Sequence, residues 1–473
     1  MTALKNMDIE THNFDPSILR EYDIRGIVGE TLNDEDALTL GKAFGTKIIQ
    51  NGGSHVCIAY DGRLSSPSFA ENLAAGLQST GCNVENLGLG PTPMLYFAVK
   101  DRKTDGGIMI TGSHNPSSYN GFKMMLQKKS VFGDDIQELG RIAASGDFAQ
   151  GNGAIKTEDI QAAYVDRLMR DFSEGHDLTI VWDNGNGATG NILKHLVEKL
   201  PGTHHLLYGD IDGNFPNHHP DPTVDKNLGD LKRTVLEKEA DLGVAFDGDG
   251  DRIGVVDEQG NIIRCDLLLT LYAKEILEKA PQSKIIADVK CSKILFEEIE
   301  KMKGVPVMCQ TGHSLVKNKM IETSSPLAGE LSGHIFFNDI YYGFDDALYC
   351  AIRLLNIVNK SDKKVSDYFA HLPKMVSTPE IRVDIEEEKK FPAIEGIKKN
   401  LKEENDNSFE MNDLDGVRVT TNEGWWLLRA SNTQNCLVSR VEAETQKGLE
   451  NLQSMVEKTL EEVDIKFSFS NQE

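Results

Sequence analysis

The chain has 473 residues, 39% of them apolar and 26% charged, and its formal net charge is −24. This length exceeds what a single hydrophobic core serves, so we expect about three or four domains. The acidic charge argues against nucleic acid and membrane surfaces as partners, because both attract a basic face.

The N-terminal sequence and the cysteines bear on location. Residues 1–14 contain no apolar run of the kind a signal peptide has. No stretch approaches the roughly 20 apolar residues that span a bilayer. The seven cysteines are scattered and show no C-x-x-C spacing, which argues against structural disulfides and zinc. We therefore expect a cytoplasmic protein.

Three segments share one layout, in which an apolar run, a polar turn and a helical period are followed by a second apolar run. They begin at His55, Leu178 and Lys284, and they predict strand–loop–helix–strand units. From about Lys374 the pattern changes to apolar runs between two helix-like segments. We expect an α/β protein of three similar α/β domains with mixed sheets, plus a smaller α+β C-terminal domain. The expected domain boundaries are 14–157, 158–261, 262–374 and 375–473.

In the first domain, the loop TGSHNPSSYNGFK (residues 111–123) directly follows a short apolar run. It displays Ser113, His114, Asn115 and Lys123, which indicates either a nucleophile or an ordinary polar loop. A serine hydrolase would need the G-x-S-x-G elbow, whose glycine positions this chain fills with Thr111 and Asn115. We also expect His114 to point away from Ser113, because neighbouring side chains of an extended chain do so.

A glycine-rich turn in the second domain resembles the dinucleotide-binding fingerprint. Gly185, Gly187 and Gly190 have the G-x-G-x-x-G spacing, and Asp210 and Asp212 follow about 20 residues later. This is the basis of a rival function, an NAD-dependent oxidoreductase. A tight turn without a nucleotide is the preferred interpretation. The neighbouring pair of histidines at 218 and 219 lacks further ligands for zinc.

The run FDGDGDR places Asp247, Asp249 and Asp251 at alternate positions. Glycines between them allow a tight turn, and three carboxylates around one point call for a cation. The spacing imitates an EF-hand, but Arg252 stands where that loop needs glycine and the flanking runs are β-type. Mg²⁺ bridging to a phosphate, with Arg252 beside it, fits better than a solvated acidic turn.

Two later motifs suggest contacts with a phosphorylated sugar. AGELSGH places Glu330, Ser332 and His334 on one face if the segment is extended, although a polar edge strand is the alternative. RASNT offers a guanidinium, hydroxyls and loop amides that suit a phosphate. The EYDIRG segment near the start is expected to put Tyr22 and Arg25 in one loop. Lys290 and His313 are weaker candidates, because a lone lysine or histidine in a loop is usually solvated.

Four motifs in order, TGSHNP, DGDGDR, GELSGH and RASNT, together with EYDIRG near the start, carry a specific resemblance. The chain resembles the α-D-phosphohexomutase family, and within it the bacterial phosphomannomutase/phosphoglucomutase group, over nearly its whole length. The resemblance implies four domains around a central cleft. It also implies reversible phosphoryl transfer between C1 and C6 of mannose or glucose phosphate, through a phosphoserine enzyme and a hexose 1,6-bisphosphate.

The same resemblance assigns roles to residues. It implies catalytic roles for Ser113, Lys123, Arg252 and His334, with His334 favoured as the base. It implies one Mg²⁺ per chain, held by Asp247, Asp249, Asp251 and the phosphoryl group on Ser113. The residues implied to bind substrate are Tyr22, Arg25, His114, Asn115, Lys290, His313, Glu330, Leu331, Ser332, Gly333, His334, Arg429, Ala430, Ser431, Asn432 and Thr433.

The resemblance leaves several alternatives open. Gln434 and Asn435 depart from the family pattern after RASNT, which puts the rim of the phosphate loop in doubt. Phosphoglucosamine mutase is the nearest alternative activity. Hexose phosphates are the expected partners, with glucose 1,6-bisphosphate or an equivalent as activator. We expect a monomer, with a dimer as the alternative.

Overall fold

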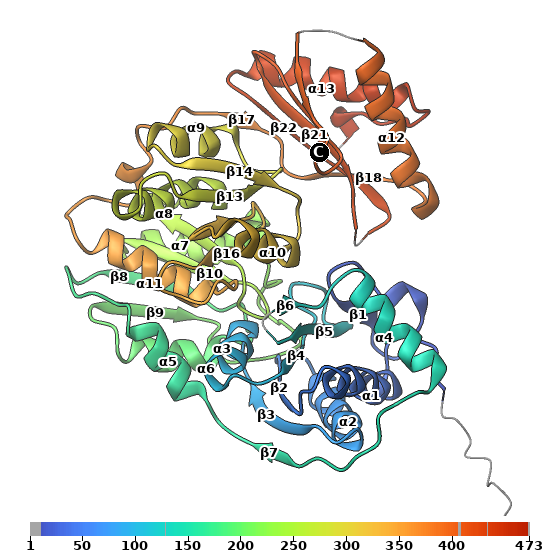
Figure 1. Ribbon diagram of the computed structural model, residues 1–473. Coiled ribbons are helices and arrows are strands. Elements are labelled where there is room, and N and C mark those ends of the chain that lie inside the picture. The colour runs from blue at the N-terminus through green and yellow to red at the C-terminus, as the bar shows by residue number, and fades with distance from the viewer. Residues whose placement is uncertain (1–10, 128, 405–407, 433, 472–473) are drawn as a thin grey trace, which may run out of the picture. The chain divides into compact units, whose positions relative to one another are not determined.

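The computed structural model describes residues 11–127, 129–404, 408–432 and 434–471, and Figure 1 shows its helices and strands. The chain divides into two compact units. Unit 1 consists of Met1–Cys265 and Ser332–Ser366, and unit 2 of Asp266–Leu331 and Asp367–Glu473. The chain passes from unit 2 back to unit 1 between Leu331 and Ser332, inside the GELSGH motif.

The first sheet of unit 1 has the strand order β1-β5-β4-β2-β3-β7, with β6 beside β5. The strands β4, β2, β3 and β7 run parallel, whereas β5 is antiparallel to both β4 and β1. Its strands are β1 (Ile24–Ile27), β2 (His55–Tyr60), β3 (Asn83–Leu89), β4 (Gly106–Ile110), β5 (Tyr119–Leu126), β6 (Lys129–Ser130) and β7 (Ile155–Thr157).

Four helices accompany this sheet, namely α1 (Asp34–Gln50), α2 (Ser66–Ser79), α3 (Thr92–Arg102) and α4 (Asp134–Ser145). The helices α1 and α2 pack side by side (Figure 1), and with α4 they share one buried apolar cluster with the sheet. A capping box between Asn33 and Asp36 fixes the start of α1. The core therefore holds β4 rigidly, and the loop after β4 carries Ser113.

The second sheet of unit 1 has the order β12-β11-β10-β8-β9, with β10, β8 and β9 parallel. Its strands are β8 (Thr179–Asp183), β9 (Thr203–Leu207), β10 (Leu242–Phe246), β11 (Ile253–Asp257) and β12 (Ile262–Ile263). The antiparallel pairing of β10 with β11 makes residues 247–252 a hairpin loop. The remaining elements of unit 1 are α5 (Gln161–Met169), α6 (Gly190–Val197), α7 (Gly229–Glu237), β16 (Ile335–Phe337) and α11 (Ala347–Val358).

Unit 2 begins with a parallel arrangement in the order β14-β13-β15. The elements of this part are α8 (Cys265–Lys279), whose first residue belongs to unit 1, β13 (Lys284–Asp288), α9 (Lys293–Lys301), β14 (Val305–Cys309), α10 (His313–Thr323) and β15 (Leu327–Gly329). With this segment, all three predicted strand–loop–helix–strand units are present, as β2-α2-β3, β8-α6-β9 and β13-α9-β14.

The C-terminal part of unit 2 is an antiparallel sheet in the order β17-β22-β21-β20-β19, with β18 beside β22. Its elements are β17 (Val376–Ser377), β18 (Ile381–Asp384), α12 (Glu387–Glu404), β19 (Glu410–Asn412), β20 (Val417–Thr420), β21 (Gly424–Ala430), β22 (Cys436–Ala443) and α13 (Gln446–Glu461). Trp426 and Leu428 face the core shared with α12 and α13. Trp425 and Leu427, at alternate positions, pack with Val289 instead.

The expected fold class is confirmed, with mixed sheets in the α/β domains and a distinct α+β C-terminal domain. The domain boundaries given above and the central cleft remain predictions.

Candidate functional site

Ser113 lies in the loop that follows β4 and is 2% exposed. Its φ of +50° lies in the left-handed region, which is uncommon for a residue with a side chain. The hydroxyl oxygen lies 3.2 Å from Asp247 Oδ2 and 3.1 Å from His114 Nδ1. The expectation that His114 points away is therefore wrong, because the left-handed turn replaces the extended backbone on which it rested. Burial lowers the pKa of His114, and Arg252 and Arg25 lower it further.

Asp247, Asp249 and Asp251 are fully buried, and one carboxylate oxygen from each lies within 4.8 Å of the others. Gly250, with φ of +77°, makes the tight turn that brings them together. The N–H groups of Gly250, Asp251 and Arg252 all donate to Asp247 Oδ1 at 3.0–3.1 Å. Asp247 thus organises the loop, while its second oxygen faces Ser113.

The electrostatics of the three carboxylates favour a cation. Burial and mutual repulsion raise the pKa of Asp247 and of Asp251. Burial also acts to raise the pKa of Asp249, but the positive charge of Lys123 outweighs this effect and lowers the pKa. Asp249 Oδ1 and Asp251 Oδ1 are buried and accept no hydrogen bond from the described residues. Oxygen donors in this arrangement fit a hard divalent cation.

Lys123 lies on β5 and supplies the nearest positive charge. Its Nζ donates to Asp249 Oδ2 at 2.7 Å and to Asp251 Oδ2, and the residue is 4% exposed. Burial alone would lower the pKa of Lys123, but the two carboxylates outweigh burial and raise it. Lys123 is therefore a fixed positive charge beside the proposed metal ligands.

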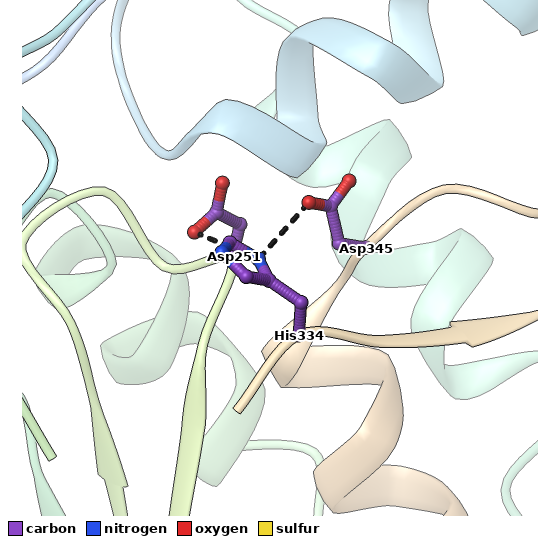
Figure 2. Close-up of side chains that lie close together, drawn as sticks. All are labelled: Asp251, His334 and Asp345. Atoms are coloured by element: carbon purple, nitrogen blue, oxygen red, sulfur yellow. Dashed lines mark ion pairs between the residues drawn. The ribbon is translucent and has the colours of Figure 1, made fainter. Parts of the chain in front are cut away.

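His334 also faces this cluster, as Figure 2 shows with Asp251 and Asp345. His334 Nδ1 lies 3.0 Å from Asp345 Oδ2 and 3.5 Å from Asp251 Oδ1, which makes the three residues a second possible metal-ligand group. However, Arg252 Nε donates to His334 Nε2 at 3.0 Å. Nε2 is then the acceptor, and the proton of a neutral ring sits on Nδ1, facing the carboxylates. This tautomer suits a base at Nε2 better than a metal at Nδ1.

The segment around His334 is not extended as expected. β15 ends at Gly329, residues 331–333 form a turn, and Gly333 has φ of +99°. The alternate spacing of Glu330, Ser332 and His334 therefore does not define a shared face. Ser332, Gly333 and His334 belong to unit 1, whereas Glu330 and Leu331 belong to unit 2.

Arg25 and Tyr22 were expected in one loop. Tyr22 does lie in a bend, but Arg25 is in β1 and is buried. The Arg25 guanidinium donates to Gly112 O and to Asp23, and its Nη1 lies 3.5 Å from Asn115 Oδ1. Arg25 thus contacts the Ser113 loop directly, because β1 pairs with β5 at the edge next to that loop.

In unit 2, Lys290 follows β13 and is 5% exposed. Its Nζ donates to Glu380 Oε2 at 2.8 Å and lies 3.9 Å from Asp288 Oδ2. Partial burial raises the pKa of Glu380, but Lys290 and then Arg429 outweigh this and lower it to about 2. Two candidate cations of unit 2 therefore share one carboxylate.

Asp288 connects the other candidate residues of this part of the chain. It accepts from the Leu331 N–H at 3.1 Å and from the Thr311 hydroxyl at 3.0 Å. Next to it, the Gly312 N–H donates to Glu330 Oε1 at 2.6 Å, and His313 begins α10. Lys290, His313, Glu330 and Leu331 are thereby held in one neighbourhood.

The phosphate loop candidates follow β21. Arg429 is 5% exposed, and its Nε donates to Asp415 Oδ2 at 2.9 Å. The Thr311 N–H donates to the same oxygen at 2.9 Å, which joins this loop to the loop after β14. Ala430 ends β21, Ser431 Oγ accepts from the Gln434 N–H at 3.2 Å, and Asn432 follows Ser431. Thr433 lies outside the described residues.

Sequence reasoning missed five residues that hold the site together, namely the four acidic residues Asp61, Asp288, Asp345 and Asp415, and Arg63, which is paired with Asp61. Asp288 and Asp61 each follow a buried parallel strand, which is a usable signal because such strand ends gather functional groups. Asp345 and Asp415 carry no comparable signal in the sequence.

The backbone of the metal loop packs directly against the glycine-rich turn. The Ala188 N–H donates to Gly248 O at 2.9 Å, and a Cβ at Gly187 would lie 3.1 Å from the carbonyl oxygens of Asp247 and Gly248. The glycines thus allow close packing on the metal-loop backbone, which favours the tight-turn interpretation over a dinucleotide site. His218 Nε2 lies 3.0 Å from Asp183 Oδ1, a structural contact.

Two further observations concern the cysteines and the helices. All seven cysteines lie in the described part of the chain, where they are buried and form no disulfide with one another. Within the described residues, none of the helices combines the length and apolar character needed to cross a membrane.

Four family models match consecutive parts of this chain. They describe phosphoglucomutase/phosphomannomutase, as alpha/beta/alpha domain I at residues 16–150, domain II at 162–260, domain III at 264–376 and the C-terminal domain at 380–459. Together the four matches cover most of the sequence in the order that the family has.

Individual relatives agree with the family models. The chain is 43% identical over 448 residues to a phosphomannomutase/phosphoglucomutase of Pseudomonas aeruginosa, covering 95% of this chain and 96% of that protein. It is 41% identical over 447 residues to a phosphoglucomutase of Neisseria gonorrhoeae, covering 94% and 96%. A crystal structure of a phosphoglucomutase/phosphomannomutase family protein from Burkholderia thailandensis superposes with a TM-score of 0.89 at 40% identity, covering 95% and 98%.

Proposed function

This chain belongs to the phosphoglucomutase/phosphomannomutase family and transfers a phosphoryl group between C1 and C6 of hexose phosphates, and from this premise we propose that Ser113 carries the phosphoryl group in transit. The observation that carries the proposal is the 3.2 Å contact between Ser113 Oγ and Asp247 Oδ2, inside a cluster of three buried carboxylates. An enzyme of this kind is an isomerase.

The transfer proceeds in two half-reactions. The bond between Ser113 Oγ and phosphorus breaks while the free hydroxyl of a hexose monophosphate forms a bond to the same phosphorus, which gives a hexose 1,6-bisphosphate. The sugar hydroxyl gives its proton to His334 Nε2, and Ser113 Oγ takes up a proton as it leaves, so that the serine hydroxyl is regenerated. The bisphosphate then presents its other phosphate, and the reverse chemistry returns a phosphoryl group to Ser113. Glucose 1,6-bisphosphate is accordingly the activator that phosphorylates Ser113 in resting enzyme.

The proposed metal is one Mg²⁺, for which the donor set fits. Asp247, Asp249 and Asp251 would hold it together with the phosphoryl group on Ser113, because two of their buried oxygens accept no hydrogen bond from described residues. The ion supplies positive charge that stabilises the transferring phosphoryl group. The chain itself fixes the three carboxylates through the hydrogen bonds that the loop N–H groups donate to Asp247.

The remaining unit 1 residues handle charge and protons. Lys123 stays protonated beside Asp249 and Asp251, so it offsets negative charge during transfer. Arg252 binds a phosphate of the substrate. When its Nε–H turns to that phosphate, the lone pair of His334 Nε2 becomes free to accept the hydroxyl proton.

A further set of residues binds the part of the substrate that does not react. Glu330, with the Leu331, Ser332 and Gly333 turn, recognises sugar hydroxyls, and Lys290 and His313 line the same neighbourhood. Arg429, Ala430, Ser431, Asn432 and Thr433 bind the distant phosphate through a guanidinium, hydroxyls and loop amides. The contact from Thr311 through Asp415 to Arg429 supports this grouping. His114, Asn115, Tyr22 and Arg25 complete the proposed substrate contacts in unit 1.

Three further proposals have less direct support. A cytoplasmic location agrees with seven buried thiols that form no disulfide with one another. The net charge of −24 argues against nucleic acid and membrane partners, and hexose phosphates are the proposed partners. A monomer is the proposed oligomeric state.

Side-by-side assays with mannose 1-phosphate, glucose 1-phosphate and glucosamine 1-phosphate test the function. We expect turnover of the two hexose phosphates, loss of that turnover in Ser113→Ala, and its retention in Ser117→Ala, a matched change at an exposed serine of the same loop. A preference for glucosamine 1-phosphate would replace the hexose assignment by the amino-sugar one. Full turnover by Ser113→Ala would refute the phosphoserine.

A further inference from the structure

Arg63 lies behind the Ser113 loop and uses all of its hydrogen-bonding capacity there. It is 1% exposed. Nη1 donates to Pro116 O and Tyr119 O, and Nη2 to Ser113 O and Asn115 O, at 2.5–2.8 Å. Nε donates to Asp61 Oδ2 at 3.1 Å. A guanidinium has five N–H donors, so the five bonds leave none for a substrate.

Asp61 completes the support of the same loop. It follows β2, and its Oδ2 accepts from the Thr111 hydroxyl at 2.9 Å and from the Gly112 N–H at 3.1 Å. The Thr111 hydroxyl oxygen in turn accepts from the Ser113 N–H at 2.7 Å. Asp61 therefore holds the residues before Ser113, while Arg63 holds Ser113 and the residues after it.

These contacts explain the unusual backbone of the loop. A Cβ at Gly112 would lie 2.2 Å from Arg63 Nε, so only glycine fits against the guanidinium. The Ser113 carbonyl points at Arg63. The N–H of His114, which belongs to the same planar peptide, therefore points away from Arg63. Four of the five bonds hold the loop directly, and the fifth holds Asp61, which supports the same loop. Together they over-determine a loop whose central residue has φ of +50°, a conformation that costs of order 1–3 kcal/mol and needs such support.

The second α/β domain covers the other side of Arg63. The Phe215 ring centroid lies 5.3 Å from the guanidinium carbon, and a Cβ at Gly213 would lie 2.6 Å from Arg63 Cα. His219 Nε2, from the same segment, contacts His114 O. Arg63 is thus enclosed between the Ser113 loop and residues 213–219, where water cannot replace its bonds.

We infer that Arg63 is a positioning residue for phosphoryl transfer, which acts by fixing the loop that aims Ser113 Oγ at Asp247. The inference rests on the proposed role of Ser113. Lysine cannot substitute, because three donors on one nitrogen cannot serve four carbonyl oxygens and a carboxylate. A displaced loop lowers the rate of transfer, whereas binding of the sugar and of its distant phosphate, which Arg63 does not touch, is preserved.

The test compares Arg63→Lys with Arg353→Lys. Arg353 is also 1% exposed and lies on α11, where its Nη1 donates to Asp339 at 2.9 Å. We expect Arg63→Lys to lower kcat roughly 100-fold, as for a nucleophile misplaced by about 1 Å, with KM changed by less than about threefold. Phosphorylation of Ser113 by glucose 1,6-bisphosphate should slow by the same factor. Arg353→Lys should keep kcat per folded molecule.

A second variant keeps the inference testable if lysine disturbs folding. Arg63→Ala leaves a guanidinium-sized space, and millimolar guanidinium chloride should restore part of kcat, while sodium chloride at equal ionic strength should not. Equal kcat losses in the two lysine variants, or no loss in Arg63→Lys, would overturn the inference. Full activity of Ser113→Ala would instead refute the phosphoserine proposal, so the two failures are distinguishable.

Discussion

The hydroxyl oxygen of Ser113 lies 3.2 Å from Asp247 Oδ2, although the two residues are 134 positions apart in the chain. Each sits in a loop after a buried strand, Ser113 after β4 and Asp247 after β10. The buried hydroxyl contacts one member of a cluster of three buried carboxylates, an arrangement that suits metal-assisted group transfer. This contact joins the proposed nucleophile to the proposed metal ligands and underlies the predictions that follow.

Asp249→Asn should lower kcat about 100-fold or more, because charge stabilisation by a metal is worth several kcal/mol. The measurement is turnover against Mg²⁺ concentration after treatment with chelator. Glu258→Gln is the matched control, since Glu258 would be the twelfth position of an EF-hand but instead accepts from Ser366. The control should keep normal metal dependence. Chelated wild-type protein working at full rate would contradict the metal assignment.

Lys123→Met should destabilise the metal-free protein by about 3–5 kcal/mol, because it removes the cation that neutralises two buried carboxylates. Added Mg²⁺ should recover part of this loss, since the ion takes over the neutralisation. Thermal or urea unfolding with and without Mg²⁺ measures both effects. If Mg²⁺ raised the free energy of unfolding of the variant no more than that of wild type, Lys123 and the metal would not share these carboxylates.

Arg429→Ala should weaken substrate binding by roughly 1.5–3 kcal/mol, the range for a hydrogen bond to a charged group. The bisphosphate should also escape more often between half-reactions. Steady-state assays should therefore show a raised KM and a partial recovery of rate when glucose 1,6-bisphosphate is added. An unchanged KM would remove Arg429 from the phosphate site and leave the chemistry at Ser113 intact.

Glu380 gives a pH-dependent prediction. Lys290 and Arg429 hold its pKa at about 2, below the ordinary value of 4.5. Its ionised form therefore stabilises the native state above pH 4.5, and this contribution is lost as the pH falls from about 4.5 to about 2. Glu380→Gln lacks the contribution, so its free energy of unfolding should fall less steeply over that window. Denaturant titrations at several pH values provide the comparison, and parallel curves for the two proteins would contradict it.

Much of the fold was accessible from the sequence because the relevant signals are local. Apolar runs followed by helical periods predicted three β-α-β units, and the structure has them. The alternate aspartates at 247–251, separated by glycines, predicted the cluster that forms there. In both cases the residues that determine the structure are neighbours in the chain.

The errors arise where the backbone leaves an extended path or where the partner is distant. The left-handed φ of Ser113 turns His114 toward the hydroxyl, and the sequence does not reveal that φ because it depends on Arg63, 50 residues away. The turn at residues 331–333 departs from an extended path at Gly333, whose φ is +99°. Arg63 itself occurs in a DGR turn that looks ordinary, because its five acceptors become visible only when the chain is folded.

Measuring whether the protein carries the mass of a phosphoryl group on Ser113 tests the central claim most directly. The enzyme is incubated with glucose 1,6-bisphosphate, freed of ligand, and examined by intact-mass measurement and mapping of the peptide that contains residues 111–123. We expect one phosphoryl group on Ser113, lost when glucose 6-phosphate is mixed in, at a rate no slower than kcat. A protein that turns over hexose phosphates without ever carrying phosphate on Ser113 would contradict the account.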